Sequence, residues 1–318
     1  MAGAGIVFLG TSEFAAAVLE RLAQDREHRP ALVLTRPDRP AGRGRRLTAP
    51  PVAERARALG LAIAQPASVN DDDARALIGA DGARRTVVVC AFGALIKEPL
   101  LSEHDILNVH PSLLPRWRGA APIERAIIAA DERTGVSIMR LTAGLDSGPV
   151  CLQGEEPLLA HDTYGSLAPR LERLGAELLV RALEQRPPFR EQDESGATYA
   201  DKIAADDRLL DPARPAVEHE RVVRALHPHI GARVELEDGT LLGVHRAALN
   251  PVVADDPVVA DAQDQHDRDA PPGLLVSDGR LLLACSPGTL ELLEVQPPGA
   301  RAMDAASYLR GHAPAGRR

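Results

Sequence analysis

Three polar residues of the chain have the types and spacing needed to stabilise an oxyanion and to move a proton. Asn108 and His110 lie two positions apart at the end of a short apolar run, and Asp146 lies further along, between Gly144 and Gly148. On a strand, residues two apart leave from the same face, so both side chains can act on one atom. An amide donor, an imidazole and a carboxylate from a separate loop can stabilise an oxyanion, move a proton and orient the proton carrier.

Each of these residues alone has a plainer interpretation. A single histidine is more often structural than catalytic, and an aspartate between two glycines is often a turn residue. All three, however, lie beside turn formers at the ends of apolar runs, where side chains project into a crevice rather than a core. Their combination therefore favours a catalytic site.

The elements that must position these residues follow an alternating pattern of strands and helices. We expect apolar strands at 6–10, 31–34, 61–64, 87–91 and 106–110, a helix from about 13 to 23, a helix at 122–130, strands at 136–141 and 149–155, and a helix at 166–183. Strands that are apolar on both faces are typical of a sheet covered by helices. The pattern predicts a Rossmann-like α/β domain, with a mostly parallel sheet and helices on both faces. Asn108 and His110 lie at the carboxyl end of one strand, where open parallel sheets bind ligands.

A second domain is expected because the chain has 318 residues, which exceeds the usual size of a single core. Short strands at 233–236, 241–247, 281–284 and 290–295, with Asp238-Gly239 as a hairpin turn, predict a small all-β barrel. We place a catalytic domain at 1–188, a polar linker at 189–206 and the barrel at 207–318. The aspartate-rich stretch 251–272 is expected to be a disordered loop between barrel strands, and it is assigned no function.

Composition excludes several classes of protein. Cys90, Cys151 and Cys285 are odd in number and far apart, which argues against a disulfide framework and a zinc cluster, and no metal site is predicted. No apolar run approaches the length of about 20 residues that spans a membrane, and no basic segment precedes the first apolar run, so we expect a cytoplasmic protein. The net charge of −8 means that any nucleic-acid contact must be local.

One such local surface is the loop at 35–46, whose proline and glycine residues exclude a regular helix and predict a flexible loop. It carries the five arginines Arg36, Arg39, Arg43, Arg45 and Arg46. A solvated surface and a phosphate-contacting surface explain these charges about equally well.

The assembled motifs resemble the methionyl-tRNA formyltransferase family over nearly the whole chain. The resemblance is carried by 8–15 (FLGTSEFA), 36–44 (RPDRPAGRG), 108–123 (NVHPSLLPRWRGAAPI), 144–148 (GLDSG), 199–203 (YADKI) and 295–303 (VQPPGARAM). The SLLP and GLD motifs are shared by the wider group that uses 10-formyltetrahydrofolate. The arginine loop and the C-terminal domain select the enzyme that acts on tRNA.

The resemblance implies an activity and a set of site residues. Formyl transfer from 10-formyltetrahydrofolate to initiator methionyl-tRNA, without a metal, would depend on Asn108, His110 and Asp146. The folate would be held by backbone groups of Phe92, Gly93, Ala94, Leu95, Ser112, Leu113, Leu114 and Pro115. The arginines of the loop, of which Arg43 is the best match, and an OB-like C-terminal barrel would contact the tRNA. Nothing in the sequence requires more than a monomer.

Three alternatives predict different behaviour. A formyltransferase acting on a small amine, such as an amino sugar, needs no arginine loop. A catalytically silent tRNA-binding protein would bind tRNA without turnover. A nicotinamide dehydrogenase is disfavoured, because Gly10 is not followed by the remaining glycines of the dinucleotide fingerprint and Thr35-Arg36 replaces the expected acidic residue.

Overall fold

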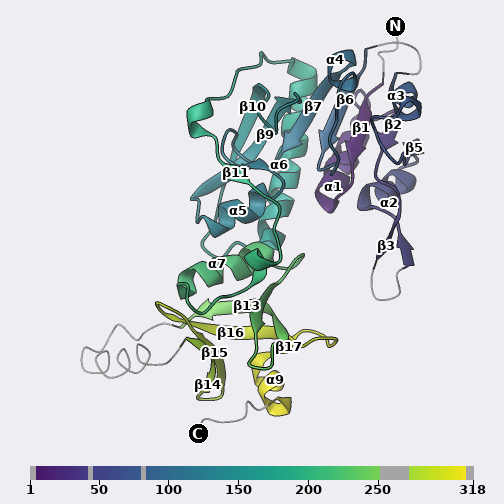
Figure 1. The fold of residues 1–318 in the computed structure, drawn as a ribbon. Helices are drawn as coiled ribbons and strands as arrows, with labels where there is room; N and C mark the ends of the chain where they lie inside the picture. Colours follow the sequence, from purple (N-terminus) through teal and green to yellow (C-terminus); the bar gives the residue numbers. More distant parts are fainter. Residues whose placement is uncertain (1–4, 42–45, 80–83, 251–271, 313–318) are drawn as a thin grey trace. The chain divides into compact units, whose positions relative to one another are not determined.

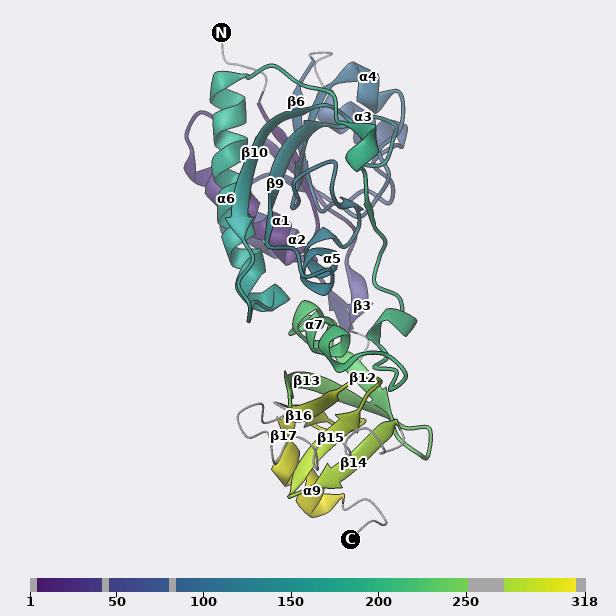
Figure 2. The ribbon, with the colours of Figure 1, turned by 90° about the vertical axis from the view of Figure 1, so that its left-hand side faces the viewer.

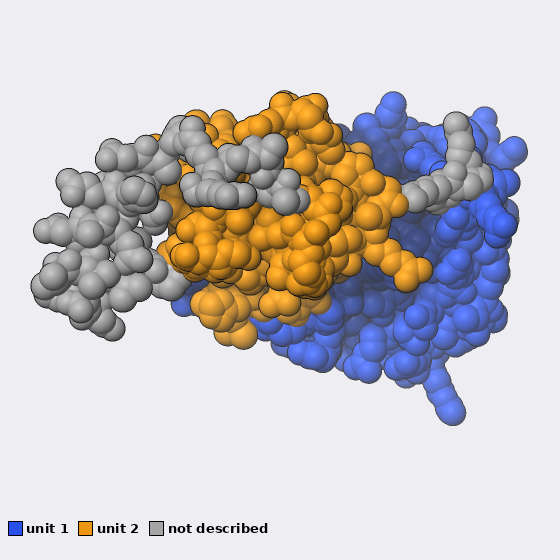
Figure 3. All heavy atoms as spheres, turned by 90° about the horizontal axis from the view of Figure 1, so that it is seen from below, with its two compact units in different colours: residues 1–122, 132–157, 168–201 blue, residues 123–131, 158–167, 202–318 orange. Residues whose placement is uncertain are grey.

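The chain forms two compact units in a computed structural model that describes residues 5–41, 46–79, 84–250 and 272–312. The N-terminal unit comprises residues 1–122, 132–157 and 168–201, and the C-terminal unit comprises 123–131, 158–167 and 202–318 (Figure 3). The C-terminal unit thus takes in two short stretches from the middle of the chain. The predicted domain boundaries at 188 and 206 stay predictions.

The N-terminal unit is built on a seven-stranded sheet in the order β10-β9-β7-β6-β1-β2-β5 (Figure 1). The strands from β5 to β7 are parallel, whereas β9 pairs antiparallel with both β7 and β10. Their bounds are β1 (Val7–Gly10), β2 (Leu32–Leu34), β5 (Ile63–Ala64), β6 (Thr86–Cys90), β7 (Asp105–His110), β9 (Arg133–Arg140) and β10 (Val150–Pro157). The prediction of a mostly parallel α/β sheet is confirmed.

Helices cover both faces of this sheet because its strands are apolar on both sides (Figure 2). Val7, Val87 and Val89 pack on one face with Ile78 and Leu100, which belong to α3 and α4. On the opposite face, Gly175 of α6 lies so close to Val109 and Val136 that a side chain there would touch both valines. The helices of this unit are α1 (Glu13–Gln24), α2 (Pro51–Ala58), α3 (Asp72–Ile78), α4 (Leu100–Glu103) and, from residue 168 on, α6 (Tyr164–Gln185). Helix α5 (Pro122–Ile128) belongs to the C-terminal unit except for its first residue.

The arginine-rich segment differs from the flexible loop predicted for it. Strands β3 (Arg39–Ala41) and β4 (Arg46–Thr48) form an antiparallel hairpin in which Pro40 lies opposite Leu47. A two-stranded ribbon has only edge strands, and an edge strand tolerates proline because one row of its N–H groups needs no partner. Residues 42–45, with Arg43 and Arg45, lie outside the described residues.

The C-terminal unit contains an antiparallel half-barrel in the order β12-β13-β16-β15-β14, with β17 paired to β16. The strands are β12 (Ala232–Glu235), β13 (Leu241–Leu249), β14 (Gly273–Ser277), β15 (Arg280–Ala284), β16 (Thr289–Gln296) and β17 (Met303–Asp304). The predicted turn at Asp238-Gly239 joins β12 to β13, and Gly239 takes the positive φ of 79° that such turns require. The predicted acidic loop lies outside the described residues over 251–271.

Two helices that the sequence pattern did not indicate complete this unit. Helices α7 (Ala216–Leu226) and α9 (Ala305–Gly311) bury Val222, Leu226 and Tyr308 in one core with the sheet residues Leu283 and Leu292. Among the described ranges of the whole chain, no helix is long and apolar enough to cross a membrane.

The segment predicted as a linker is attached to the N-terminal unit by hydrogen bonds. Residues 190–200, here called the strap, begin with a bridge between Arg190 and Val150. They continue through a short 3₁₀ turn (Glu194–Gly196) to β11 (Tyr199–Ala200), which pairs in parallel with β8 (Arg118–Gly119). The strap therefore contacts the segment that follows β7.

Candidate active site

Asn108 and His110 lie at the carboxyl end of β7, beside the carboxyl end of β6. Val89 of β6 pairs with Asn108, and the two predicted residues share one face of β7 because they are two apart. Their exposed fractions are 8% for Asn108 and 4% for His110. A buried amide and a buried imidazole at this position must find polar partners, because burying them without hydrogen bonds is costly.

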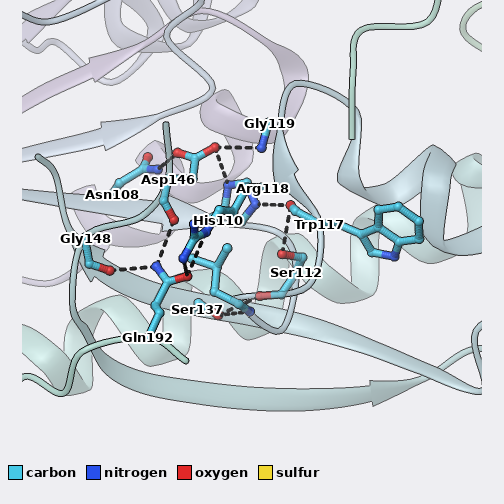
Figure 4. A network of polar contacts seen from close by, with 11 residues as sticks. Asn108, His110, Ser112, Trp117, Arg118, Gly119, Ser137, Asp146, Gly148 and Gln192 are labelled. Carbon is cyan, nitrogen blue, oxygen red and sulfur yellow. Dashed lines mark hydrogen bonds and ion pairs between the residues drawn. The ribbon is translucent and has the colours of Figure 1, made fainter. Parts of the chain in front are cut away.

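Asp146 supplies these partners from a separate loop, as predicted (Figure 4). Its Oδ1 accepts a hydrogen bond from Asn108 Nδ2 at 3.4 Å, and its Oδ2 lies 3.6 Å from His110 Nδ1. The same Oδ2 accepts the backbone N–H of Gly119 at 2.9 Å. Asp146 has φ 45°, so its backbone occupies the left-handed region that ordinary residues seldom adopt. The structure thus brings the three predicted residues together around one carboxylate.

The second ring nitrogen of His110 is also bonded, which fixes the ring. His110 Nε2 lies 2.7 Å from the carbonyl oxygen of Trp117, and this oxygen also accepts the Ser112 hydroxyl at 3.2 Å. A carbonyl can only accept, so the hydrogen of this bond is on Nε2. His110 therefore turns Nδ1 toward Asp146, and Nδ1 is the nitrogen available for proton exchange.

Comparison with known proteins identifies the family. A model of the formyl transferase family matches residues 4–183, and a model of the formyl transferase C-terminal domain matches 202–313. A methionyl-tRNA formyltransferase from Ruegeria pomeroyi is 41% identical over 310 residues, covering 96% of each chain. The chain belongs to the methionyl-tRNA formyltransferase family. The predicted family and enzyme class are confirmed.

Two solved structures show the same fold at low sequence identity. Methionyl-tRNA formyltransferase from Clostridium thermocellum superimposes with a TM-score of 0.55 at 13% identity, covering 77% of this chain and 93% of that one. HypX from Aquifex aeolicus in complex with tetrahydrofolic acid gives a TM-score of 0.61 at 15% identity, covering 98% of this chain and 48% of that one.

The residues predicted to hold the folate follow two adjacent strands. Phe92, Gly93, Ala94 and Leu95 come directly after β6, where Gly93 has φ 73° and open space around its α-carbon. Phe92 is buried and its carbonyl accepts the Thr11 hydroxyl at 2.7 Å, while Leu95 is 65% exposed. Open backbone next to an exposed apolar side chain at the carboxyl end of a parallel strand fits an apolar ring system.

The second group of predicted folate residues follows β7, and Ser137 hydrogen-bonds to its backbone. The Ser137 hydroxyl donates to the Ser112 carbonyl at 2.6 Å and accepts the Leu114 N–H at 3.1 Å. Gln153 donates to the Leu114 carbonyl at 2.8 Å. Ser112 is fully buried, and its hydroxyl donates to the Trp117 carbonyl oxygen that also bonds to the His110 ring. Leu113 and Pro115 belong to the same segment.

The predicted tRNA-contacting arginines that the structure describes are Arg36, Arg39 and Arg46, and they do not belong to this cluster of polar contacts. Arg39 and Arg46 are exposed on β3 and β4, and Arg36 is partly buried just before them. Arg43 and Arg45 lie outside the described residues. Within the described ranges, no group of three or more histidine, cysteine, aspartate or glutamate residues could hold a metal ion.

Sequence reasoning missed three residues that the structure adds to the site. Gly119 donates its N–H to Asp146, Arg118 lies fully enclosed behind it, and Gln192 of the strap bonds to the loop that carries Asp146. Arg118 and Gly119 fall inside the motif that predicted the site, so their position was a usable signal. Gln192 lies in a polar stretch that resembles any solvated linker, and its composition gave no such signal.

Proposed function

We propose that this chain transfers the formyl group of 10-formyltetrahydrofolate to the α-amino group of methionine on initiator methionyl-tRNA, using Asn108, His110 and Asp146. The observation that carries the proposal is the buried cluster at the carboxyl end of β7. In it, one carboxylate accepts from an amide and a backbone N–H and faces an imidazole nitrogen. Membership of the family supplies the reaction.

The folate supplies the formyl carbon on its N10 nitrogen. A bond forms between the amino nitrogen and the formyl carbon, the bond from that carbon to N10 breaks, and one amine proton ends on N10. Asn108 Nδ2 carries two hydrogens, one of which is given to Asp146, so the second is available to an oxyanion. His110 Nδ1 is the other donor when it too carries a proton, and removal of one such donor typically costs about 3 to 4 kcal/mol of barrier.

Asp146 orients these donors and accepts the proton that the amine loses. Its Oδ2 is held by the Gly119 N–H and faces His110 Nδ1, so a proton on this carboxylate or on Nδ1 can pass between them. No nucleophilic serine or cysteine is needed, because the amine is itself the nucleophile.

Binding of the two substrates is assigned to separate parts of the chain. The backbone at Phe92–Leu95 and Ser112–Pro115 would hold the folate, because both segments flank Asn108 at the ends of adjacent strands. Arg36, Arg39, Arg43, Arg45 and Arg46 and the C-terminal half-barrel would contact the tRNA. A basic hairpin on a chain of net charge −8 concentrates the positive charge that phosphate contacts require. We place the enzyme in the cytoplasm as a monomer.

The direct test is turnover with defined acceptors. The purified protein is incubated with 10-formyltetrahydrofolate and methionine-charged initiator tRNA, and formylmethionyl-tRNA is separated and counted. Uncharged tRNA and free amino sugars are the control acceptors. Product confined to the charged tRNA supports the proposal, whereas turnover only with a small amine overturns the acceptor and keeps the chemistry.

Two variants test the catalytic residues and the tRNA-binding residues separately. Asp146→Asn should abolish rapid turnover while folate binding persists, and turnover equal to wild type would remove Asp146 from the mechanism. Arg43→Ala should weaken the reaction with charged tRNA. An unchanged rate in that variant would remove the tRNA-binding role of Arg43.

A further inference from the structure

We propose that Gln192 is a positioning residue of the active site: it clamps the loop that carries Asp146 onto the buried Arg118. The strap is then part of the catalytic machinery as well as the chain that leads to the C-terminal unit. This inference rests on the proposed role of Asp146, because Gln192 acts through that residue. The hydrogen bonds of its side chain go to Arg118, Asp146 and Gly148 rather than to Asn108 or His110.

The amide of Gln192 uses all of its hydrogen-bonding capacity on three residues. Its Nε2 donates to the Asp146 carbonyl at 2.8 Å and to the Gly148 carbonyl at 2.7 Å. Its Oε1 accepts from Arg118 Nε at 3.1 Å and from Arg118 Nη2 at 2.9 Å. An amide offers two donors and two lone pairs, so the side chain is saturated and has one orientation.

Arg118, to which Gln192 bonds, is itself held in one position. Its side chain is 2% exposed, and its Nη1 and Nη2 donate to the two carboxylate oxygens of Glu194 at 2.9 and 2.7 Å. The hydrogen bond to Glu194 raises the pKa of Arg118, so the guanidinium stays charged. A buried guanidinium bonded by Gln192 and Glu194 is expensive to displace, because any movement leaves a charge unsatisfied. Both partners belong to the strap.

The loop that carries Asp146 needs such support. Gly144 and Leu145 are exposed, with Leu145 at 60%, so few packed contacts hold the first half of the loop. The left-handed backbone of Asp146 is less favourable than the ordinary conformations of such a residue, so the loop must be held in it. Gln192 holds the carbonyl of this same residue, and the carbonyl fixes how the carboxylate faces Asn108 and His110 (Figure 4).

The strap also holds the other side of the cluster. Thr198 accepts the Arg118 N–H with its carbonyl at 2.9 Å and the Trp117 N–H with its hydroxyl at 3.1 Å. Trp117 presents the carbonyl that fixes His110, and Gly119 presents the N–H that binds Asp146. One segment therefore sets three atoms of the site: the Trp117 oxygen, the Gly119 nitrogen and, through Gln192, the Asp146 carbonyl.

The experiment compares variants that remove the clamp with a matched neighbour. Gln192→Met keeps the size of the side chain without hydrogen bonds, and Gln192→Glu puts carboxylate oxygens against two carbonyls. We expect kcat to fall ~100-fold in both, as for a displacement of about 1 Å at a reacting group, with both KM values within about 3-fold of wild type. The control is Glu191→Gln, which exchanges the same two residue types in the opposite direction at the exposed neighbouring position, and it should keep the wild-type kcat.

A double variant distinguishes positioning from a general structural role. Single-turnover rates are measured for Asp146→Asn alone and combined with Gln192→Met. If Gln192 acts through Asp146, the second substitution slows the first variant less than 3-fold. A further ~100-fold loss, or a wild-type kcat in Gln192→Met, overturns the inference. A wild-type rate in Asp146→Asn overturns the proposed mechanism itself, and the inference with it, so the two failures are told apart.

Discussion

Replacing Gly119 with alanine should damage both the stability and the turnover of this enzyme. Gly119 has φ 117°, which residues with a side chain rarely adopt. A methyl group at Gly119 would lie 2.8 Å from the carbonyl oxygen of Ala200, whereas ordinary van der Waals contact begins near 3.4 Å. The paired strands β8 and β11 must therefore separate by roughly 0.6 Å, which is the difference between those two distances.

The loss of stability in Gly119→Ala follows from the strained backbone and from the crowding against Ala200. The strained backbone costs about 1 to 3 kcal/mol, and crowding against the strap costs about as much again, so we expect a loss of about 2 to 6 kcal/mol. Because the Gly119 N–H binds Asp146 at 2.9 Å, a shift of the segment also moves the carboxylate. A displacement of this order should lower kcat ~10- to 100-fold.

The control for this substitution is Gly60→Ala. Gly60 also has a positive φ of 65°, but nothing lies within 4 Å of a side chain built there, so it isolates the backbone cost of about 1 to 2 kcal/mol. Urea denaturation followed by circular dichroism measures stability, and formylmethionyl-tRNA production measures kcat. A Gly119→Ala variant no less stable than Gly60→Ala and with wild-type kcat would refute the close approach of strap and site.

Three further predictions concern the C-terminal unit. Leu292→Ala, at a fully buried position, should cost about 2 to 5 kcal/mol in urea denaturation, and a loss under 1 kcal/mol would contradict the packing. Asp207→Asn weakens its double hydrogen bond with Arg125 and should cost about 1 to 2 kcal/mol, less at 1 M salt; no salt dependence would contradict an ion pair. Burial lowers the pKa of His219 below its ordinary 6.5, so near that pH the unfolded chain binds a proton that the folded unit does not bind. The contribution of His219 to the free energy of unfolding is therefore complete above pH 6.5 and falls as the pH drops below it. His219→Gln should flatten that decline between pH 7.5 and 5.5 in the same denaturation assay.

Most of the α/β unit was predictable because its pattern is local. Strands such as β6 and β7 are short apolar runs, and α1 begins where Ser12 caps the N–H of Ala15, as its Thr-Ser-Glu sequence indicates. The pairing of β3 with β4 was missed because it joins Arg39 to Thr48, nine positions further along the chain, and neither three-residue strand carries a strand pattern of its own. Helix α7 was missed because a helix of 11 residues is stabilised mainly by packing, here against β13 and β16.

The candidate site also contains residues that local sequence predicts and one residue that it does not. The spacing of Asn108 and His110 on a strand predicted that they share a face, and the glycines around Asp146 predicted a turn from which its side chain projects into a crevice. Gln192 lies 46 residues from Asp146 and 74 from Arg118, so only the folded chain brings them together. A polar residue in a proline-containing stretch has the composition of a solvated linker, and nothing local distinguishes it.

These contacts lead us to expect that a working catalytic unit needs residues beyond the predicted boundary at 188. A fragment ending at residue 188 keeps Asn108, His110 and Asp146 but loses Gln192 and Glu194, which leaves the guanidinium of Arg118 buried without its partners. It also loses Ala200, whose pairing with Gly119 holds the N–H that binds Asp146. The candidate catalytic residues and the residues that fix their geometry therefore belong to one unit, and that unit includes the whole strap.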